Sequence, residues 1–310
     1  MAKISENGKY VTLDGVRVSY RKSDNTIHIT STDEDFEAGF HLTLNEGSSA
    51  ERGLRQILID NGIVEEETLK DKLPEFVAAP TDRGVWDKIR LGVTSDGTLV
   101  SWHVALSPHG LIAGAVEPIV ELIKNHCVRH ETKWDVYVVN TQNHVTPNTK
   151  HHAVNLRGAT KMLYDLVDEM GQRFAYMAKL EVNHFDKLPV NTGAKNIMVL
   201  LEDYNSLFST TQNARTQDET DFIELLHRLV RLGRAAGIHI VINATRPDVR
   251  FLPGELRNNL GLRIVMGRMD STPSSILLES GEAVRTRPDV NGRGVIRMNG
   301  EILSFQAFTR

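Results

Sequence analysis

The sequence predicts an α/β fold in which a mostly parallel sheet is flanked by helices and preceded by a small α+β module. From about residue 85 onward, short strand-like runs alternate with longer helical stretches. Runs such as "IMVLL" and "IHIVI" are continuously apolar and rich in β-branched residues, which is typical of strands buried on both faces of a parallel sheet. This alternation favours a doubly wound or RecA-like domain.

The composition is globular: 310 residues, 40% hydrophobic and 25% charged, are enough for one sizeable domain and a smaller one. The formal net charge of −4 does not indicate nucleic-acid binding, although it leaves room for a local basic face. No apolar run approaches the roughly 18 residues of a membrane span, and the first residues lack the apolar core of a signal peptide. Cys127 is the single cysteine, so no internal disulfide exists. We expect a cytoplasmic protein with no membrane partner.

The predicted N-terminal module covers residues 1–82, and the larger domain covers residues 83–310. "YVTLDGVRVSY" has two β-rich arms around an Asp-Gly pair, a strong hairpin signal, and "TIHIT" and "FHLTL" are typical of further strands. "GSSAERGLRQILIDNG" predicts a helix that begins with a capping box from Ser48 to Glu51. A stretch with prolines and a glycine around Pro80 marks the boundary.

The larger domain is predicted to begin with a second Asp-Gly hairpin in "RLGVTSDGTLVSWHV". The elements that follow, in chain order, are a strand and helix in "HGLIAGAVEPIVELI", a strand in "WDVYVV", a helix in "GATKMLYDLVDEMGQRFAYMAK", a strand in "NIMVLL", a helix in "ETDFIELLHRLVRLGRAAG", strands in "IHIVIN" and "LRIVMG", and two closing strands. Core packing explains the apolar residues of the amphipathic helices without a ligand.

Several of these segments, in this order, resemble the motor domain of the FtsK/SpoIIIE DNA translocases, which are ring-forming P-loop ATPases that pump double-stranded DNA. The segments are "HGLIAGA", "HCVRHETKWDVYVV", "LVDEMGQRFAYMAK", "RLGRAAGIHIVINATRPDVRFLPGELRNNLGLRI" and "GRGVIRMNGEILSFQAF". The resemblance implies a RecA-like P-loop NTPase core over residues 83–310, with ATP and Mg²⁺ as cofactors and double-stranded DNA as partner. The first eighty residues have no counterpart in it.

The sequence departs from the family where the phosphates would bind. The family's Walker A loop ends in Gly-Lys-Ser or Gly-Lys-Thr, whose backbone N–H groups, ammonium and hydroxyl hold phosphates and Mg²⁺. The corresponding residues here are Gly114, Ala115, Val116, Glu117, Pro118, Ile119, Val120 and Glu121. Val120 removes the cation, Pro118 removes an N–H donor, and Glu117 and Glu121 add carboxylates. Losing one charge contact at 4 Å costs about 4 kcal/mol, or roughly a thousandfold in affinity.

The helix that follows this loop still has free N–H groups at its N-terminus. Pro118 suits the first helical position, and Glu117 or Glu121 can compensate the helix dipole. Our hypothesis is a former anion site whose anion the protein now supplies. The alternative is a surface helix that never bound a nucleotide.

Three other elements of the family's ATPase site also differ. The Walker B strand ends in Glu202-Asp203 instead of Asp-Glu, so the two acids are exchanged in order. They are either a degenerate catalytic pair or the solvent-facing end of a strand. Asn140-Thr141-Gln142 replaces the family's "DPK", and Thr245 stands where the resemblance expects a sensor Gln. These changes predict a pseudo-ATPase without a cofactor. ATP and Mg²⁺ enter only under the alternative of an atypical ATPase.

Two sets of arginines are candidates for contacts with DNA or a neighbouring subunit. One set recurs at three-residue spacing and is predicted to lie along one side of a helix: Arg228, Arg231 and Arg234. These side chains either face solvent, contact a neighbouring subunit or bind DNA, and the sequence leaves all three alternatives open. A looser second set lies near strand ends: Arg246, Arg250, Arg257, Arg263 and Arg268. Of this set, Arg246 and Arg257 join the first three as the strongest candidates. Any DNA contact is expected to be electrostatic and independent of base sequence.

Histidines provide no predicted metal site. His126 and His130 have the i, i+4 spacing of two zinc ligands on a helix, but no third ligand is near in sequence. His151-His152 is expected in a polar loop without a role.

The sequence thus predicts a catalytically degenerate FtsK/SpoIIIE-like protein that acts by oligomeric assembly, with itself as a ring or with an active relative. Sequence-independent contact with double-stranded DNA accompanies assembly. The chain's small size favours an origin in a phage, plasmid or other mobile element. Two alternatives remain: an active DNA-translocating ATPase that uses Glu202 or Asp203, and a scaffold that binds only proteins.

Overall fold

The computed structural model describes residues 73–309 except for short gaps (115–116, 142–148, 150, 190–191, 209–214, 245–249, 282, 284–285 and 287–289), and before them only the backbone of five strands. The chain divides into two compact units, Met1–Lys72 and Leu73–Arg310, and each is described by itself.

The first unit contains a five-stranded antiparallel sheet in the order β1-β2-β3-β4-β5. Its strands are β1 (Lys3–Ile4), β2 (Val11–Leu13), β3 (Val16–Arg21), β4 (Thr26–Ser31) and β5 (Gly39–Thr43). Leu13 pairs with Val16, which confirms the first predicted hairpin. The predicted helix after Ser48 lies outside the described residues.

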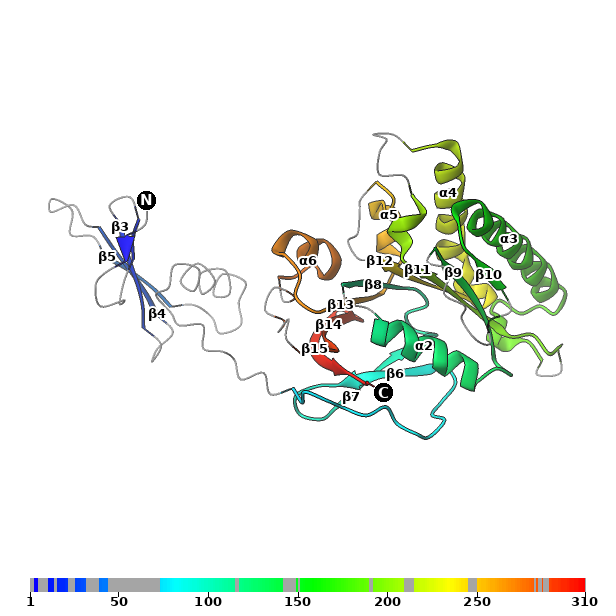
Figure 1. Ribbon diagram of the computed structural model, residues 1–310, viewed down its shortest axis with the longest axis horizontal. Coiled ribbons are helices and arrows are strands. Elements are labelled where there is room, and N and C mark those ends of the chain that lie inside the picture. Colours follow the sequence, from blue (N-terminus) through cyan, green and yellow to red (C-terminus); the bar gives the residue numbers. More distant parts are fainter. Residues whose placement is uncertain are drawn as a thin grey trace. The chain divides into compact units, whose positions relative to one another are not determined.

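The second unit is built on a ten-stranded sheet with the order β10-β9-β11-β12-β8-β13-β14-β15-β6-β7 (Figure 1). Its strands are β6 (Lys88–Val93), β7 (Leu99–His103), β8 (Gly110–Gly114), β9 (Trp134–Asn140), β10 (His151–Ala153), β11 (Asn196–Glu202), β12 (Ile238–Ala244), β13 (Leu262–Met266), β14 (Arg293–Met298) and β15 (Glu301–Ala307). The stretch from β10 to β13 is parallel, and the remaining pairs are antiparallel. The predicted mostly parallel sheet is confirmed.

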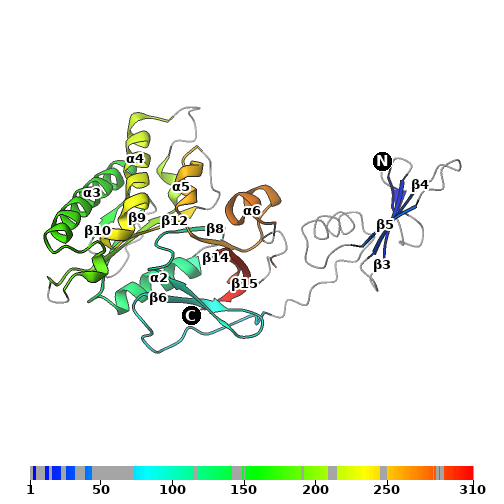
Figure 2. The same cartoon turned by 180° about the vertical axis from the view of Figure 1, so that it is seen from behind.

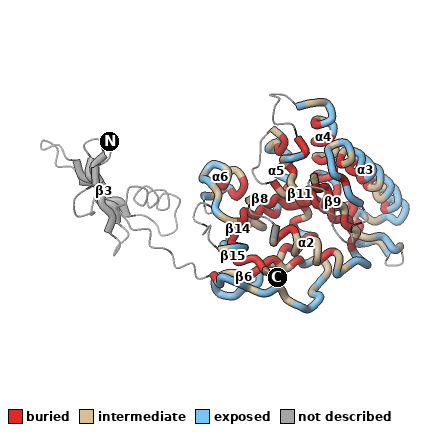
Figure 3. Tube along the Cα trace, viewed as in Figure 1, coloured by how far each residue is buried: buried red, intermediate tan, exposed pale blue. Residues whose placement is uncertain are grey.

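Helices cover both faces of this sheet (Figures 1 and 2). They are α2 (Glu117–Arg129), α3 (Leu156–Lys179), α4 (Gln217–Leu232), α5 (Gly254–Asn258) and α6 (Ser271–Leu278). Side chains alternate between the two faces of a strand, so β11 contributes to the hydrophobic core on each face of the sheet. Val199 packs in the cluster with α3 and α4, and Leu200 packs in the cluster with α2 and β6. The strands at the centre are therefore buried along most of their length (Figure 3).

The second unit begins at Leu73, ten residues before the predicted boundary. The buried guanidinium of Arg293 on β14 explains this, because it donates to Leu73 O and Pro74 O at 3.0 and 2.9 Å. Ala78 then bridges to Thr309 near the C-terminus. Residues after Leu73 are thus fastened to the last strands of the sheet.

The sequence-based placement of His151-His152 in a polar loop is wrong. These residues form the edge strand β10, which pairs in parallel with β9. The His151 ring stacks on the Tyr137 ring with centroids 3.9 Å apart. The strand is only three residues long, so it lacks the apolar run by which longer strands are recognised.

No helix in the described part of the chain is both long and apolar enough to cross a membrane.

Candidate nucleotide and DNA site

The predicted Walker A and Walker B residues lie at one edge of the sheet, where the parallel strands end. Ile242 of β12 pairs with Leu201 of β11 on one side and with Leu111 of β8 on the other. Glu202, at the end of β11, is therefore level with Ile112 of β8, two strands or about 10 Å away, and Gly114 lies two residues further along β8. The carboxyl edge of a parallel sheet is where such folds bind ligands.

The connection between β8 and α2 is short. β8 ends at Gly114 and α2 begins at Glu117, so residues 117–121 are helical. Ile119 and Val120 are 0% and 5% exposed and pack in the core cluster shared with β6. Pro118 lies in the first turn, as predicted, where a missing N–H costs no helical hydrogen bond. Ala115 and Val116 lie outside the described residues.

Gly114 is required by the sheet itself. Its φ is +88°, and a Cβ at this position would overlap the carbonyl oxygen of Met266 on the neighbouring strand β13. The single loop glycine that matches the family therefore has a structural role that does not involve phosphate.

Glu121 forms an ion pair with Lys124 one turn further along α2. Part of its charge is neutralised there, away from the helix N-terminus. The Glu117 side chain is not among the described ones, so the hypothesis of an internal anion stays a prediction.

The two predicted Walker B acids, Glu202 and Asp203, are half-buried and hydrogen-bonded to neighbours. Asn140 Nδ2, at the end of β9, donates to Glu202 Oε2 at 2.7 Å. Asp203 Oδ2 accepts from Ser206 Oγ at 2.5 Å and from Thr141 Oγ1 at 3.3 Å. The structure thus brings together the predicted pairs at 140–141 and 202–203, whereas Gln142 and Thr245 lie outside the described residues.

Glu202 keeps one carboxylate oxygen without a hydrogen-bond partner. Its Oε1 is buried and has none among the described residues. Asp203 adopts the left-handed conformation, with φ +51°, which Asp tolerates better than most residues. A buried acceptor without a donor is costly, so this oxygen marks a position that attracts a donor or a cation.

An aromatic cluster that sequence reasoning missed supports this edge. Tyr204, in the short 3-10 helix η3 (Tyr204–Leu207), donates its hydroxyl to Phe251 O at 2.6 Å. The rings of Phe208 and Phe251 stack with centroids 4.2 Å apart. The segments after β11 and after β12 are therefore joined, and only the aromatic residues in "YNSLF" could have suggested it.

The first arginine set is exposed, and only two of its three members lie on the predicted helix. Arg228 and Arg231 lie on α4, and Arg234 lies in the 3-10 helix η4 (Gly233–Ala236). Within the described part of the chain, none of their side chains makes a hydrogen bond or ion pair. The capping box between Thr216 and Glu219 fixes the start of α4. Arg246 lies outside the described residues.

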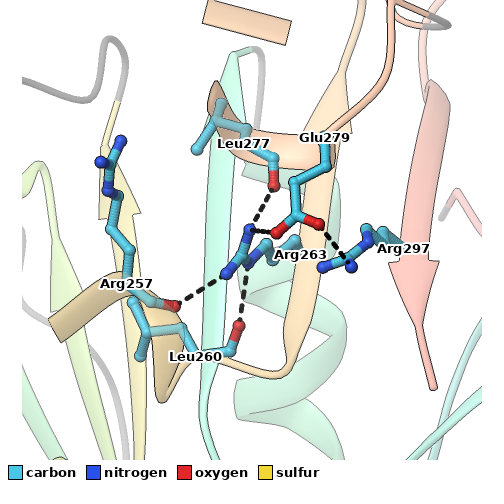
Figure 4. A network of polar contacts seen from close by, with 6 residues as sticks. All are labelled: Arg257, Leu260, Arg263, Leu277, Glu279 and Arg297. Carbon is cyan, nitrogen blue, oxygen red and sulfur yellow. Dashed lines mark hydrogen bonds and ion pairs between the residues drawn. The ribbon is translucent and has the colours of Figure 1, made fainter. Parts of the chain in front are cut away.

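The second set does not form one basic face, because Arg263 is buried (Figure 4). Its guanidinium donates to the carbonyls of Leu260, Leu277 and Arg257, and to Glu279 Oε1 at 3.1 Å. Glu279 also binds Arg297 at 2.8 Å. The expectation of Arg263 as part of a DNA-facing set is therefore wrong, since this side chain joins the ends of α5 and α6. Arg257 is half-buried and Arg268 is exposed.

His126 and His130 also have structural partners. His126 Nε2 donates to Trp86 O at 2.9 Å, and His130 Nε2 donates to Arg83 O at 2.8 Å. No group of three metal-ligating side chains occurs among the described residues.

A parallel sheet with helices on both faces, and a strand-to-helix connection at its centre, is the architecture of P-loop NTPases. Solved structures agree. The pCW3 conjugation coupling protein TcpA, a monomer form with ATPγS, aligns with a TM-score of 0.67 at 18% identity, over 99% of this chain and 89% of that one. The type VII secretion ATPase EccC of Thermomonospora curvata aligns with a TM-score of 0.59 at 19% identity, over 74% of this chain and 30% of EccC. The P-loop NTPase fold is therefore established.

The homologues in sequence are FtsK/SpoIIIE DNA translocases. The FtsK domain-containing protein YdcQ of Bacillus subtilis is 24% identical over 219 residues, 66% of this chain and 44% of YdcQ. The DNA translocase SpoIIIE of B. subtilis is 25% identical over 257 residues, which are 70% of this chain and 31% of SpoIIIE. The chain thus spans less than half the length of these relatives. No protein-family model matches it. The chain is FtsK/SpoIIIE-like, as the resemblance predicted.

Proposed function

We propose that this chain is an FtsK/SpoIIIE-like protein that does not hydrolyse ATP at the β8–α2 connection. It acts by oligomeric assembly, with itself or with an active relative, and by sequence-independent contact with double-stranded DNA. One observation carries the first part: α2 begins three residues after Gly114, and Val120 is buried in its first turn.

Two features of the β8–α2 connection support the proposal that it does not bind a nucleoside triphosphate. A phosphate cradle needs a loop of free backbone N–H groups and a cation that reaches the β and γ oxygens. Here residues 117–121 are helical, and the position of the cation holds an apolar side chain packed in the core. Binding would require the first residues of α2, 117–119, to unwind into a loop, and the buried Val120 would still supply no cation.

Assembly and DNA contact are supported by the exposed arginines. Arg228, Arg231 and Arg234 project from one segment, α4 to η4, without partners in the described part of the chain. Cations of this kind neutralise phosphates or pair with acids of a neighbouring subunit. The names of the homologues, DNA translocases, make DNA the first partner to test.

A second candidate is an atypical ATPase. The buried Glu202 Oε1, which lacks a partner among the described residues, favours it, because such an oxygen could bind a cation or orient a water. An ATPase of this kind needs a lysine or arginine to neutralise the phosphate oxygens of ATP, and this cation would come from elsewhere in the chain or from a neighbouring subunit.

The two candidates are separated by phosphate release from ATP with and without duplex DNA. The proposed function predicts no release above the rate of a Glu202→Gln control in either condition. Release that is stimulated by DNA and lost in both Glu202→Gln and Asp203→Asn would establish the ATPase.

The DNA contact is tested by a gel shift of duplexes of unrelated sequence over a range of salt. The shift should be independent of sequence, weaken as salt rises, and be reduced in the double variant Arg228→Gln/Arg231→Gln. Lys179→Gln, an exposed cation at the end of α3, is the matched control. Oligomers without any shift would instead favour the protein scaffold.

A further inference from the structure

A recess lies at the C-terminal half of α2, on the side of β6 (the two elements are neighbours in Figure 1). It is open to solvent, and its volume is about 360 Å³ when the open space at its mouth is included. Its polar lining is dominated by cations from three segments: Arg83, Lys88, Arg90 and Arg129. The single acid in the lining is Asp82. We propose that this recess binds a phosphate group.

The loop that carries Arg83 is fixed to the end of α2 by hydrogen bonds in both directions. Arg83 Nε donates to Arg129 O at 3.0 Å, and His130 Nε2 donates back to Arg83 O at 2.8 Å. Trp86 O accepts from both His126 Nε2 and Trp134 Nε1. The loop that carries Arg83 and the helix end that carries Arg129 are therefore held together before any ligand arrives, which reduces the entropic cost of binding.

Most of this charge is not neutralised within the protein. Arg90 is paired with Asp82 at 2.7 Å. Arg83 uses its Nε for the helix, while the side chains of Lys88 and Arg129 make no hydrogen bond or ion pair in the described part of the chain. Four cations against one acid leave a clear excess of positive charge. The negative end of the α2 dipole, equivalent to about half a charge, is too small to cancel it.

Phosphate is the ligand chemistry that such a set recognises. A guanidinium group can donate two parallel hydrogen bonds to two oxygens of one phosphate, and a lysine adds a flexible positive charge. The recess is separate from the predicted Walker A residues, because its lining on α2 comes from Leu122, His126 and Arg129, whereas Gly114 precedes the N-terminus of this helix. The phosphate can belong to a small anion or to a nucleic-acid backbone.

Pyrophosphate serves as the probe in calorimetry of the full chain at low salt. We expect saturable binding, weakened roughly tenfold or more in Lys88→Gln and in Arg129→Gln, since each loses a charge-assisted contact. Arg129→Gln keeps the backbone carbonyl that holds Arg83, so the loop should stay in place. Lys179→Gln, an exposed cation at the end of α3, is the matched control and should bind as the parent does.

A short duplex DNA added as competitor identifies the source of the phosphate. Displacement of pyrophosphate by the duplex, lost in Lys88→Gln, assigns the recess to the DNA backbone; retention of pyrophosphate assigns it to a small anion. The inference is overturned if pyrophosphate shows no saturable binding, or if the recess variants bind as tightly as Lys179→Gln while unfolding at the parent's denaturant midpoint.

Discussion

Gly114 and Met266 lie side by side at the ends of β8 and β13, so close that a Cβ on residue 114 would overlap the Met266 carbonyl oxygen. The family's loop begins at this glycine, yet here its conformation, with φ +88°, serves the pairing of two central strands. The pairing of these two strands is therefore sufficient to require a glycine at this position.

Gly114→Ala should destabilise the second unit strongly, because the added methyl group meets rigid backbone. Gly97→Ala is the control: Gly97 also has positive φ, +82°, but open space around it. We expect Gly114→Ala to cost at least about 2 kcal/mol more than the control in urea unfolding. Equal losses would show that the strands can separate to admit the methyl group.

Val120→Lys should not restore nucleotide binding. The new ammonium would start in the core, where Val120 is 5% exposed, and Pro118 and Glu121 would remain. We expect a loss of stability of about 2 kcal/mol or more and no heat of ATP binding. Asn125→Lys, at a half-buried position of the same helix, should be tolerated better. Tight ATP binding by Val120→Lys would mean that α2 can rearrange into a loop.

Arg263→Met should destabilise the protein because it leaves carbonyls at the ends of α5 and α6 without their donor. The expected loss is about 3 kcal/mol by urea unfolding. Arg268→Met, at an exposed position, should change stability by less than about 0.5 kcal/mol. If the two variants unfolded alike, the network in Figure 4 would contribute little.

A pair of buried histidines predicts acid sensitivity. Burial lowers the pKa of His109 to about 3, with His239 adding to the shift. Burial also lowers the pKa of His239 to about 4, although its hydrogen bond to Pro108 O opposes this. In the unfolded chain both groups titrate near 6.5, so between that pH and about 4 the unfolded state binds more protons than the folded one. Stability is complete above pH 6.5 and falls as the pH is lowered.

The expected loss is about 2 kcal/mol per histidine between pH 7.5 and pH 5. His109→Gln keeps an acceptor for the Ile240 N–H. This variant should therefore lose about 2 kcal/mol less stability than the parent between pH 7.5 and pH 5. Denaturant unfolding at both pH values measures it, with exposed His152→Gln as control. An unchanged slope in His109→Gln would contradict the assignment.

Elements with strong local signals were predictable. Burial on both faces of the sheet gives β11 and β12 continuous apolar runs. Burial on one face gives α3 apolar residues that recur with the helical period of 3.6 residues. The Asp96-Gly97 turn between β6 and β7 is equally local. The segment "GRAAGIH" keeps Gly237 for a packing reason, since a Cβ there would lie 2.8 Å from Asn196 Oδ1.

Features that depend on distant partners were not predictable. Arg263 resembles its exposed neighbours in sequence, and only the meeting of α5, α6 and β13 buries it. The Asn140–Glu202 bond joins residues on two adjacent strands, so spacing alone could not reveal it. His126 and His130 share a zinc-like spacing, but the loop at 83–86 supplies carbonyls instead.

We propose that the β8–α2 connection does not bind a nucleoside triphosphate. Calorimetric titration of the full chain with Mg-ATP at low salt, with and without duplex DNA, is the decisive measurement. We expect no heat of nucleotide binding in either condition, because Val120 is buried and α2 begins at Glu117. Saturable binding in the micromolar range that is lost in Glu202→Gln would contradict it and make the atypical ATPase the correct description.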